Sequence, residues 1–112
     1  MNWTPRRQRF RQILAGNDCI IPATVFDPLS ARMVEDLGGK VGMLAGSVAA
    51  MAILGAPDKM LITASEFADM ALRICRAGDL AVLADADHGY GNAMNVQRTI
   101  RDLDHAGLAA IK

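Results

Sequence analysis

Short apolar runs alternate with helix-forming segments along the chain, and this alternation constrains the fold more than any other feature. The runs occupy residues 19–25, 41–44, 80–84 and 108–111. Strands that are apolar on both faces are covered on both sides, as in a parallel sheet whose connections are right-handed helical crossovers. The sequence therefore predicts an α/β protein that begins with a helix and continues through four parallel strands separated by helices.

Residues that start and stop helices mark the segments between the runs. Residues 1–16 are expected to form an amphipathic helix with Thr4 as its N-cap and with its arginines in water. Three further helices are predicted, over 28–37, between Thr63 or Ser65 and Gly78, and over 95–105. Residues 45–62 are expected to be a loop.

Apolar residues that recur at helical spacing are expected to face the core. They are Leu29, Met33, Val34, Leu37, Phe67, Met70, Ala71, Ile74, Val96, Ile100 and Leu103. The two cysteines, Cys19 and Cys75, are interpreted as small core residues.

Two architectures fit this order of elements, an open doubly wound sheet and a (β/α)8 barrel. The last predicted strand reaches Lys112 with no closing helix, and a barrel needs about 250 residues. We therefore expect residues 1–112 to be the N-terminal half of a single barrel domain, with helix 1–16 preceding the barrel. A complete protein of this length would leave an unpaired parallel edge strand.

Charge and composition exclude several classes of protein. Twelve Lys and Arg residues balance twelve Asp and Glu residues, so no net field draws the chain to nucleic acid or to an anionic membrane. A hydrophobic content of 52% is too high for an intrinsically disordered segment. Two cysteines are too few for a disulfide scaffold, which makes the cytoplasm the expected compartment. Residues 41–57 carry no charge, but their glycines and the lack of aromatic anchors favour a buried strand over a membrane span.

Asp85 and Asp87 follow the third predicted strand, at the edge where parallel α/β proteins carry their active sites. Residues two apart in an extended chain point the same way, so the two carboxylates are expected to converge. Two ionised carboxylates at one point need a cation, and Mg²⁺ binds one or two carboxylates together with waters and substrate oxygens. Alternatively, an aspartate here only caps the next helix, a role that Asn92 or Asn95 could share. The pattern leaves both interpretations open.

Other polar residues are expected at the same edge. Gly46-Ser47 follows the second strand and could offer backbone N–H groups and a hydroxyl to a substrate carboxylate, although a plain turn is the better interpretation of these residues alone. Asp58 lies in the next predicted loop, where an aspartate after proline is usually a turn residue. His88 is expected to be peripheral, and Tyr90 either closes over the site or packs on its rim.

Four motifs together resemble the isocitrate lyase/phosphoenolpyruvate mutase superfamily, and most closely its bacterial oxaloacetate decarboxylase branch. The motifs are VFDPLSAR, LAGS, APD and DADHGYGNAMNVQRTI. The resemblance covers essentially the whole chain from Arg9. It implies a Mg²⁺-dependent (β/α)8 barrel that, at full length, converts the α-keto acid oxaloacetate to pyruvate and CO2 through an enolate. It also implies a homo-oligomer, commonly a tetramer or a dimer of dimers.

The resemblance assigns roles to individual residues. Asp85 would be the principal Mg²⁺ carboxylate, and Asp87 would act through a metal-bound water. Asp58 matches an aspartate that lies beside the metal site in the mutase and lyase branches. Ser47, with the amides around Gly46, would hold the carboxylate of the substrate.

Departures from the lyase branch narrow this assignment. Lyase-branch members carry a Tyr and a Ser near the second strand, where this chain has Met43 and Ala45. The lyase cysteine motif, and the arginine and histidine expected to grip the substrate, would lie beyond Lys112, so no catalytic residue is assigned within the chain. Two alternatives remain: another superfamily member, such as a methylisocitrate-type carbon–carbon lyase or a phosphonomutase, and an inactive truncated half-barrel.

Overall fold

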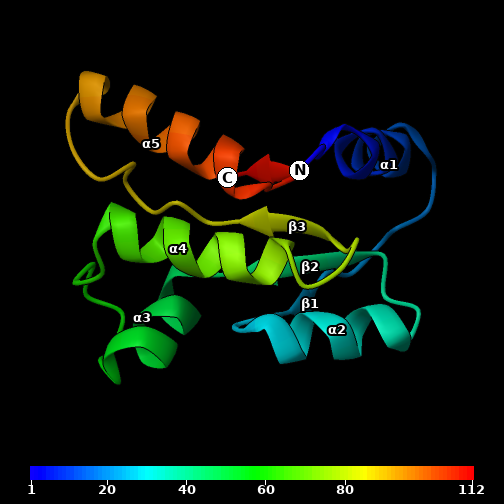
Figure 1. Ribbon diagram of the computed structural model, residues 1–112, viewed down its shortest axis with the longest axis horizontal. Coiled ribbons are helices and arrows are strands. Elements are labelled where there is room, and N and C mark those ends of the chain that lie inside the picture. Colours follow the sequence, from blue (N-terminus) through cyan, green and yellow to red (C-terminus); the bar gives the residue numbers. More distant parts are fainter.

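The computed structural model describes residues 1–112, which form five helices and one parallel sheet with the strand order β1-β2-β3-β4. The elements are α1 (Thr4–Ala15), β1 (Ala23–Thr24), α2 (Pro28–Asp36), β2 (Val41–Leu44), α3 (Gly46–Leu54), α4 (Ala64–Cys75), β3 (Ala81–Ala84), α5 (Ala93–Ala106) and β4 (Ala110–Ile111). Each strand pairs with the next one along the chain, and α2, α4 and α5 lie along one side of the sheet (Figure 1). Strands in consecutive order with their crossover helices on one side confirm the barrel architecture and exclude the doubly wound sheet, whose strand order reverses.

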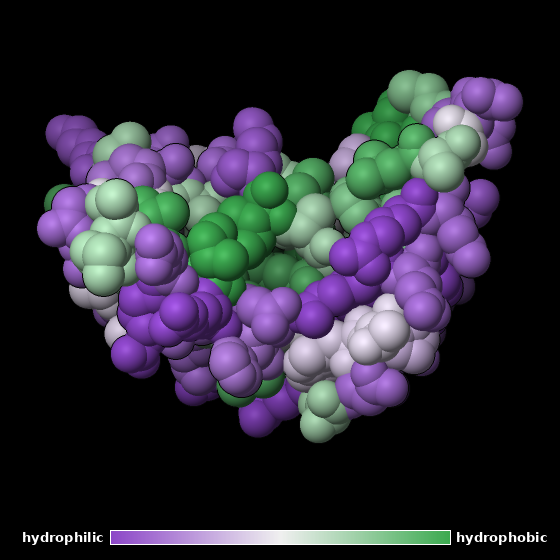
Figure 2. Space-filling model, turned by 90° about the horizontal axis from the view of Figure 1, so that it is seen from above, coloured by the Kyte–Doolittle hydropathy of each residue, from purple (hydrophilic) through white to green (hydrophobic).

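The two faces of the sheet pack against different partners. Leu44 and Val82 point toward the helices and belong to a core of 16 buried residues. Val41 and Ala81 point the other way and pack with Phe10 of α1. Helix α1 therefore covers the face that lies inside a closed barrel. Seen from above, the molecule is hollowed along one side, and apolar residues gather in the hollow (Figure 2).

Helix α1 begins one residue earlier than predicted, and its contacts differ from the expectation. Thr4 is its first residue and Trp3 its N-cap, with no side chain capping the helix. Arg6 was expected in water but is 3% exposed and donates hydrogen bonds to the carbonyl oxygens of Cys75, Gly78 and Gly107. Carbonyls at the end of a helix have no partner within that helix, so a guanidinium with five donors can be buried against them.

The first strand is shorter than the apolar run that predicted it. Only Ala23 and Thr24 pair with β2, although residues 19–25 are almost entirely apolar. Pro22 has no backbone N–H to donate to a neighbouring strand, so regular pairing starts after it. Cys19 is consequently exposed and not a core residue, whereas Cys75 is buried as expected.

Helix α3 occupies part of the segment that was expected to be a loop. Its residues, GSVAAMAIL, include no charged side chain and therefore show no contrast between a polar and an apolar face. Alanine, methionine and leucine nevertheless favour a helix, and Gly55 ends it in the left-handed conformation, with φ of 59°.

Helices α2, α4 and α5 begin with the capping residues that the sequence indicated. Asp27, Thr63 and Asn92 each accept a hydrogen bond from the first turn of α2, α4 and α5, and each forms a capping box with the residue three positions later. Asn92 starts α5 earlier than predicted, which adds residues 93–94 to this helix.

The inward faces are confirmed for α4 and only in part for α2 and α5. Phe67, Ala71 and Ile74 are buried as expected. Several residues expected in the core are instead exposed on the outside of the helical layer: Leu29 (65%), Met33 (55%), Leu37 (86%) and Ile100 (44%). None of the helices has the length and apolarity that crossing a bilayer requires.

Candidate functional site

The carboxyl ends of β2 and β3 bring the predicted site residues together. Leu44 and Ala84 are register partners, so the residues that follow them leave the sheet at the same level. The backbone N–H of Asp85 donates to the carbonyl oxygen of Leu44 at 3.0 Å, which extends the pairing by one step. The turn that starts at Asp85 and the first turn of α3 are therefore neighbours.

The closest approach between these segments is that of Asp87 to Gly46. A Cβ atom at Gly46 would lie 2.5 Å from Oδ1 and 2.6 Å from Oδ2 of Asp87. The carboxylate therefore rests against the Cα of the first residue of α3, in space that only glycine leaves free. Asp87 itself has a positive φ of 47°, a conformation that aspartate tolerates better than most residues.

The electrostatics of this edge are those of several acidic groups close together. Burial, and then the negative charges of Asp85 and Asp58, raise the pKa of Asp87 above its ordinary value, and His88 opposes this rise. The Nζ atom of Lys112 lies 3.7 Å from Oδ2 of Asp85. A cation bound between the carboxylates would relieve their repulsion.

Capping does not explain the two aspartates. The N-terminus of α5 is capped by Asn92, whose side chain accepts from the N–H groups of Met94 and Asn95 at 3.0 and 3.2 Å. Asp85 accepts one local hydrogen bond, from the N–H of Asp87 at 3.2 Å, which leaves most of its acceptor capacity free.

The donor set suits Mg²⁺ better than a metal that needs a complete protein cage. No group of three or more His, Cys, Asp or Glu side chains is arranged to hold a metal ion. Mg²⁺ keeps several waters and binds through one or two carboxylates together with substrate oxygens, so Asp85 and Asp87 are sufficient. The residues present therefore fit this ion.

The N-terminus of α3 adds a site for an anion. Ala45, its N-cap, has no side-chain acceptor, so the first N–H groups of the helix are not capped by a side chain. These groups and the helix dipole favour a negative charge beside Gly46 and the half-buried Ser47. Sequence reasoning expected a turn here and missed the helix; the run of helix-favouring residues after Ser47 was the available signal. Asp58, in contrast, is exposed on the connection after α3.

Tyr90 packs beneath the rim of the site. Its ring centroid lies 6.1 Å from that of Phe67 and 5.3 Å from that of His88. Burial and the charges of Asp87 and Asp85 raise the pKa of Tyr90 to about 12.

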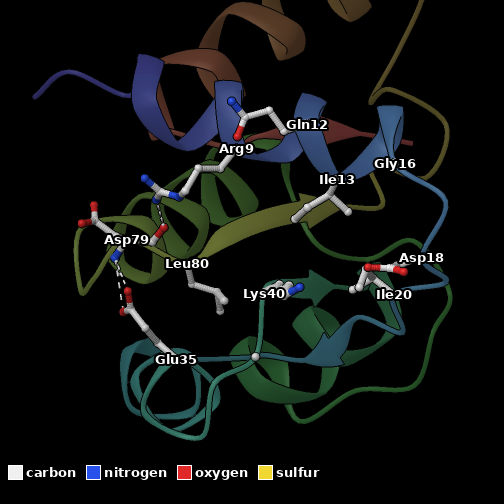
Figure 3. Close-up of a pocket in the computed structure, with 11 residues that line it drawn as sticks. Arg9, Gln12, Ile13, Gly16, Asp18, Ile20, Glu35, Lys40, Asp79 and Leu80 are labelled. Carbon is white, nitrogen blue, oxygen red and sulfur yellow. Dashed lines mark hydrogen bonds between the residues drawn. The ribbon is translucent and has the colours of Figure 1, made fainter.

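A cavity of about 540 Å³ lies at the opposite end of the strands from the candidate site, between α1 and the amino ends of the strands (Figure 3). Arg9 extends from α1 to the carbonyl oxygen of Asp79, and Glu35 accepts hydrogen bonds from the N–H of Asp79 at 3.0 and 3.2 Å. The hydrogen bonds of Arg9 and Glu35 thus fix the backbone of Asp79, in the turn before β3. The cavity contains none of the predicted site residues.

Comparison with known proteins shows the family. The sequence pattern described as phosphoenolpyruvate phosphomutase matches residues 10–112. The oxaloacetate decarboxylase 1 of Pseudomonas fluorescens (strain Pf0-1) is 60% identical over 105 residues, which are 94% of this chain and 36% of that protein. The oxaloacetate decarboxylase of Rhodopseudomonas palustris (strain BisB18) is 55% identical over 111 residues, which are 99% of this chain and 38% of that protein. The chain thus spans a little more than a third of these relatives.

Solved structures show the same fold. A phosphoenolpyruvate phosphomutase from Streptomyces platensis subsp. rosaceus superposes with a TM-score of 0.87 at 31% identity, over 94% of this chain and 36% of the other. A phosphonopyruvate hydrolase in complex with oxalate and Mg²⁺ superposes with a TM-score of 0.86 at 26% identity, over 95% and 37%.

Proposed function

The chain belongs to the phosphoenolpyruvate phosphomutase family, and from that premise we propose that the whole protein decarboxylates oxaloacetate to pyruvate and CO2 with Mg²⁺ as its cofactor. One observation carries the proposal: the carboxylate of Asp87 lies against Gly46 at the N-terminus of α3, within the field of the Asp85 carboxylate. A cation site beside an anion site matches an α-keto acid, because its keto oxygen can bind a metal ion and its carboxylate can accept hydrogen bonds from N–H groups.

The carboxylates supply the metal side of the site. Asp85 would bind Mg²⁺ directly, and Asp87 would hold one of its waters. Asp58 acts on Asp87 through its charge and would also contact the ion through water. The Mg²⁺ complex of the related phosphonopyruvate hydrolase supports this choice of ion.

The first turn of α3 supplies the substrate side. The N–H groups around Gly46 and the hydroxyl of Ser47 would hold the carboxylate next to the keto group. The second carboxylate, the one to be lost, would then be free of the helix N-terminus. Carbon–carbon cleavage then leaves its electron pair on the three-carbon product as an enolate, which a proton converts to pyruvate.

Bound Mg²⁺ would act as a Lewis acid toward the enolate oxygen as negative charge develops there. Asp85 and Asp87 would fix the ion and the helix N-terminus would fix the substrate, so the chain would contribute mainly by orienting the reactants.

The test is a decarboxylation assay on the whole protein. We expect loss of oxaloacetate well above the rate with Mg²⁺ alone, and a fall on the order of 100-fold in Asp85→Ala, because a metal's charge stabilisation is worth several kcal/mol. Asp36→Ala removes an exposed carboxylate on α2 and should change nothing. A wild-type rate equal to the metal-only rate, or an unaffected Asp85→Ala, would contradict the proposal. Cleavage of methylisocitrate instead would favour the lyase alternative.

We further propose that the protein works in the cytoplasm and as a homo-oligomer, for which a tetramer is our expectation. Both cysteines are free, which suits a reducing compartment. The exposed apolar side chains of α2 and its C-cap, among them Leu29 and Leu37, offer a surface for association. Sedimentation of the whole protein measures its stoichiometry.

A further inference from the structure

The hydroxyl of Tyr90 is buried, and the packing of the ring does not explain why. Its oxygen is enclosed by protein and has no hydrogen-bond partner, a condition shared only with Nε of Arg6, whose other guanidinium nitrogens are bonded. Leaving a buried hydroxyl unpaired costs about 1–3 kcal/mol. The ring packs on Phe67 as a phenylalanine ring could, so this packing does not require the hydroxyl.

The backbone around Tyr90 fixes this hydroxyl in place. Gly89, Tyr90 and Gly91 have positive φ values of 78°, 65° and 147°. A left-handed conformation costs a residue with a side chain roughly 1–2 kcal/mol and persists where the surroundings enforce it, often at functional sites. Thr99 adds one contact to this turn, because its hydroxyl donates to the carbonyl oxygen of Gly89 at 2.9 Å.

The hydroxyl lies in the field of the carboxylates on the same turn. Asp87 and Asp85 both act on it through their charges. A phenolic hydroxyl can donate one hydrogen bond, and this one has no partner. Ionised carboxylates are acceptors only, which makes them its natural partners.

We propose that Tyr90 is a positioning residue of the metal centre, whose hydroxyl donates to the carboxylate of Asp87 and holds it in the orientation that orders the water of the bound cation. The inference rests on the Mg²⁺ site of the proposed function. Carboxylates that serve a metal are usually held by hydrogen bonds from outer groups, and losing such a group weakens metal affinity about 10- to 100-fold. A cation between Asp85 and Asp87 would reduce their repulsion and leave the carboxylate of Asp87 able to accept this hydrogen bond.

The test compares Tyr90→Phe with the wild type by the Mg²⁺-dependent rise in Tm of the whole protein, without substrate. We expect the dissociation constant for Mg²⁺ to rise about tenfold or more. We also expect the Tm without Mg²⁺ to stay level or rise, because the ring remains and an unpaired hydroxyl is gone. Thr99→Val is the matched control, since it removes a paired hydroxyl from the same turn and should lower the Tm with little effect on Mg²⁺ affinity.

Two results would overturn the inference: Mg²⁺ binding as tight in Tyr90→Phe as in the wild type, or a loss of affinity just as large in Thr99→Val. The proposed function is judged separately, by the oxaloacetate assay. A wild type that decarboxylates oxaloacetate beside an unimpaired Tyr90→Phe leaves the function standing and removes the role of Tyr90. If the wild type is inactive toward oxaloacetate but its Mg²⁺ binding depends on Tyr90, the role of Tyr90 stands and the proposed function falls.

Discussion

Gly46 shows how a single missing side chain can decide the geometry of the site. In Gly46→Ala, the new Cβ would meet the Asp87 carboxylate at 2.5 Å, so the carboxylate has to move. Because a displacement of about 1 Å at a reacting centre can cost about 100-fold in rate, we expect decarboxylation by the whole protein to fall by that order. The fold should remain, since alanine favours a helix over glycine by about 1 kcal/mol.

The measurements are the rate of oxaloacetate loss and the Tm of Gly46→Ala beside Gly16→Ala. The nearest contact of a Cβ at Gly16 is 3.4 Å, an ordinary distance, so this control should keep the wild-type rate. An active Gly46→Ala would mean that Asp87 does not need its place against α3.

The two cysteines should differ sharply in reactivity. Cys19 is exposed, whereas burial raises the pKa of Cys75 to about 11 and outweighs the opposing charges of Arg6 and Arg7. The thiolate is the reactive form, so a raised pKa and burial both protect Cys75. We expect an alkylating reagent at pH 8 to modify Cys19 in the folded protein and to reach Cys75 only after unfolding, as peptide mapping can show. Labelling of both residues at similar rates would contradict this placement.

Among the helices, α1 depends on Arg6 for its attachment to α4 and α5. The guanidinium lies over the Trp3 ring at 4.8 Å and bonds to carbonyls at the ends of both helices. We expect Arg6→Met to lower the free energy of unfolding by about 2–4 kcal/mol, because buried carbonyls lose charged donors. Arg11→Met, on the exposed side of α1, is the control and should change it by less than about 0.5 kcal/mol. Urea unfolding of the whole protein measures both, and equal effects would show that Arg6 is not the anchor.

The capping box of α4 gives a pH-dependent contribution to stability. The N–H and the hydroxyl of Thr63 both donate to Glu66, and these bonds lower the pKa of Glu66. A lowered pKa in the folded state means that the charged form stabilises the fold above the ordinary pKa of 4.5 and that this effect is lost as the pH falls through the lowered value.

We therefore expect Glu66→Gln to lower the Tm at pH 7, and its difference from the wild type to shrink as the pH falls below 4.5. Asp36→Asn, which removes an exposed charge on α2, should show no such convergence. A Tm difference for Glu66→Gln that stays constant over this range would rule out a contribution from the charge.

Periodicity and capping residues located most elements, and the exceptions share a physical cause. Helix α3 was missed because an element without charged residues shows no amphipathic contrast, and its N-terminus is half of the candidate site. Leu29 and Leu37 follow a helical period and were expected in the core, but both are exposed. The period alone does not show which face of a helix meets the sheet. Arg6 was placed in water because its partners, three backbone carbonyls, lie 69 to 101 residues away in sequence. Asp85 and Asp87 could be named as candidates because their place after a strand is local information.

At the scale of the whole molecule, the sheet is an arc with two unpaired edges. β1 and β4 are its first and last strands, so each carries backbone groups on one side without a strand partner. The face that lies inside a barrel keeps Met43, Leu83 and Ala110 only half-buried. In the relatives, which are more than twice as long as this chain, there is ample sequence to cover these surfaces.

Residues 1–112 expressed alone should therefore associate with themselves. Unpaired parallel edges and exposed apolar surface are templates for pairing between copies, so we expect a weight-average mass that grows with concentration in sedimentation experiments. Ala110→Lys in β4 should reduce this association, because a lysine on an edge strand opposes pairing with another chain. Arg11→Lys, which keeps the charge of an exposed position on α1, should leave it unchanged. A monomer at every concentration would show that the four strands and five helices satisfy their own surfaces, and the relatives' additional length would then serve catalysis more than stability.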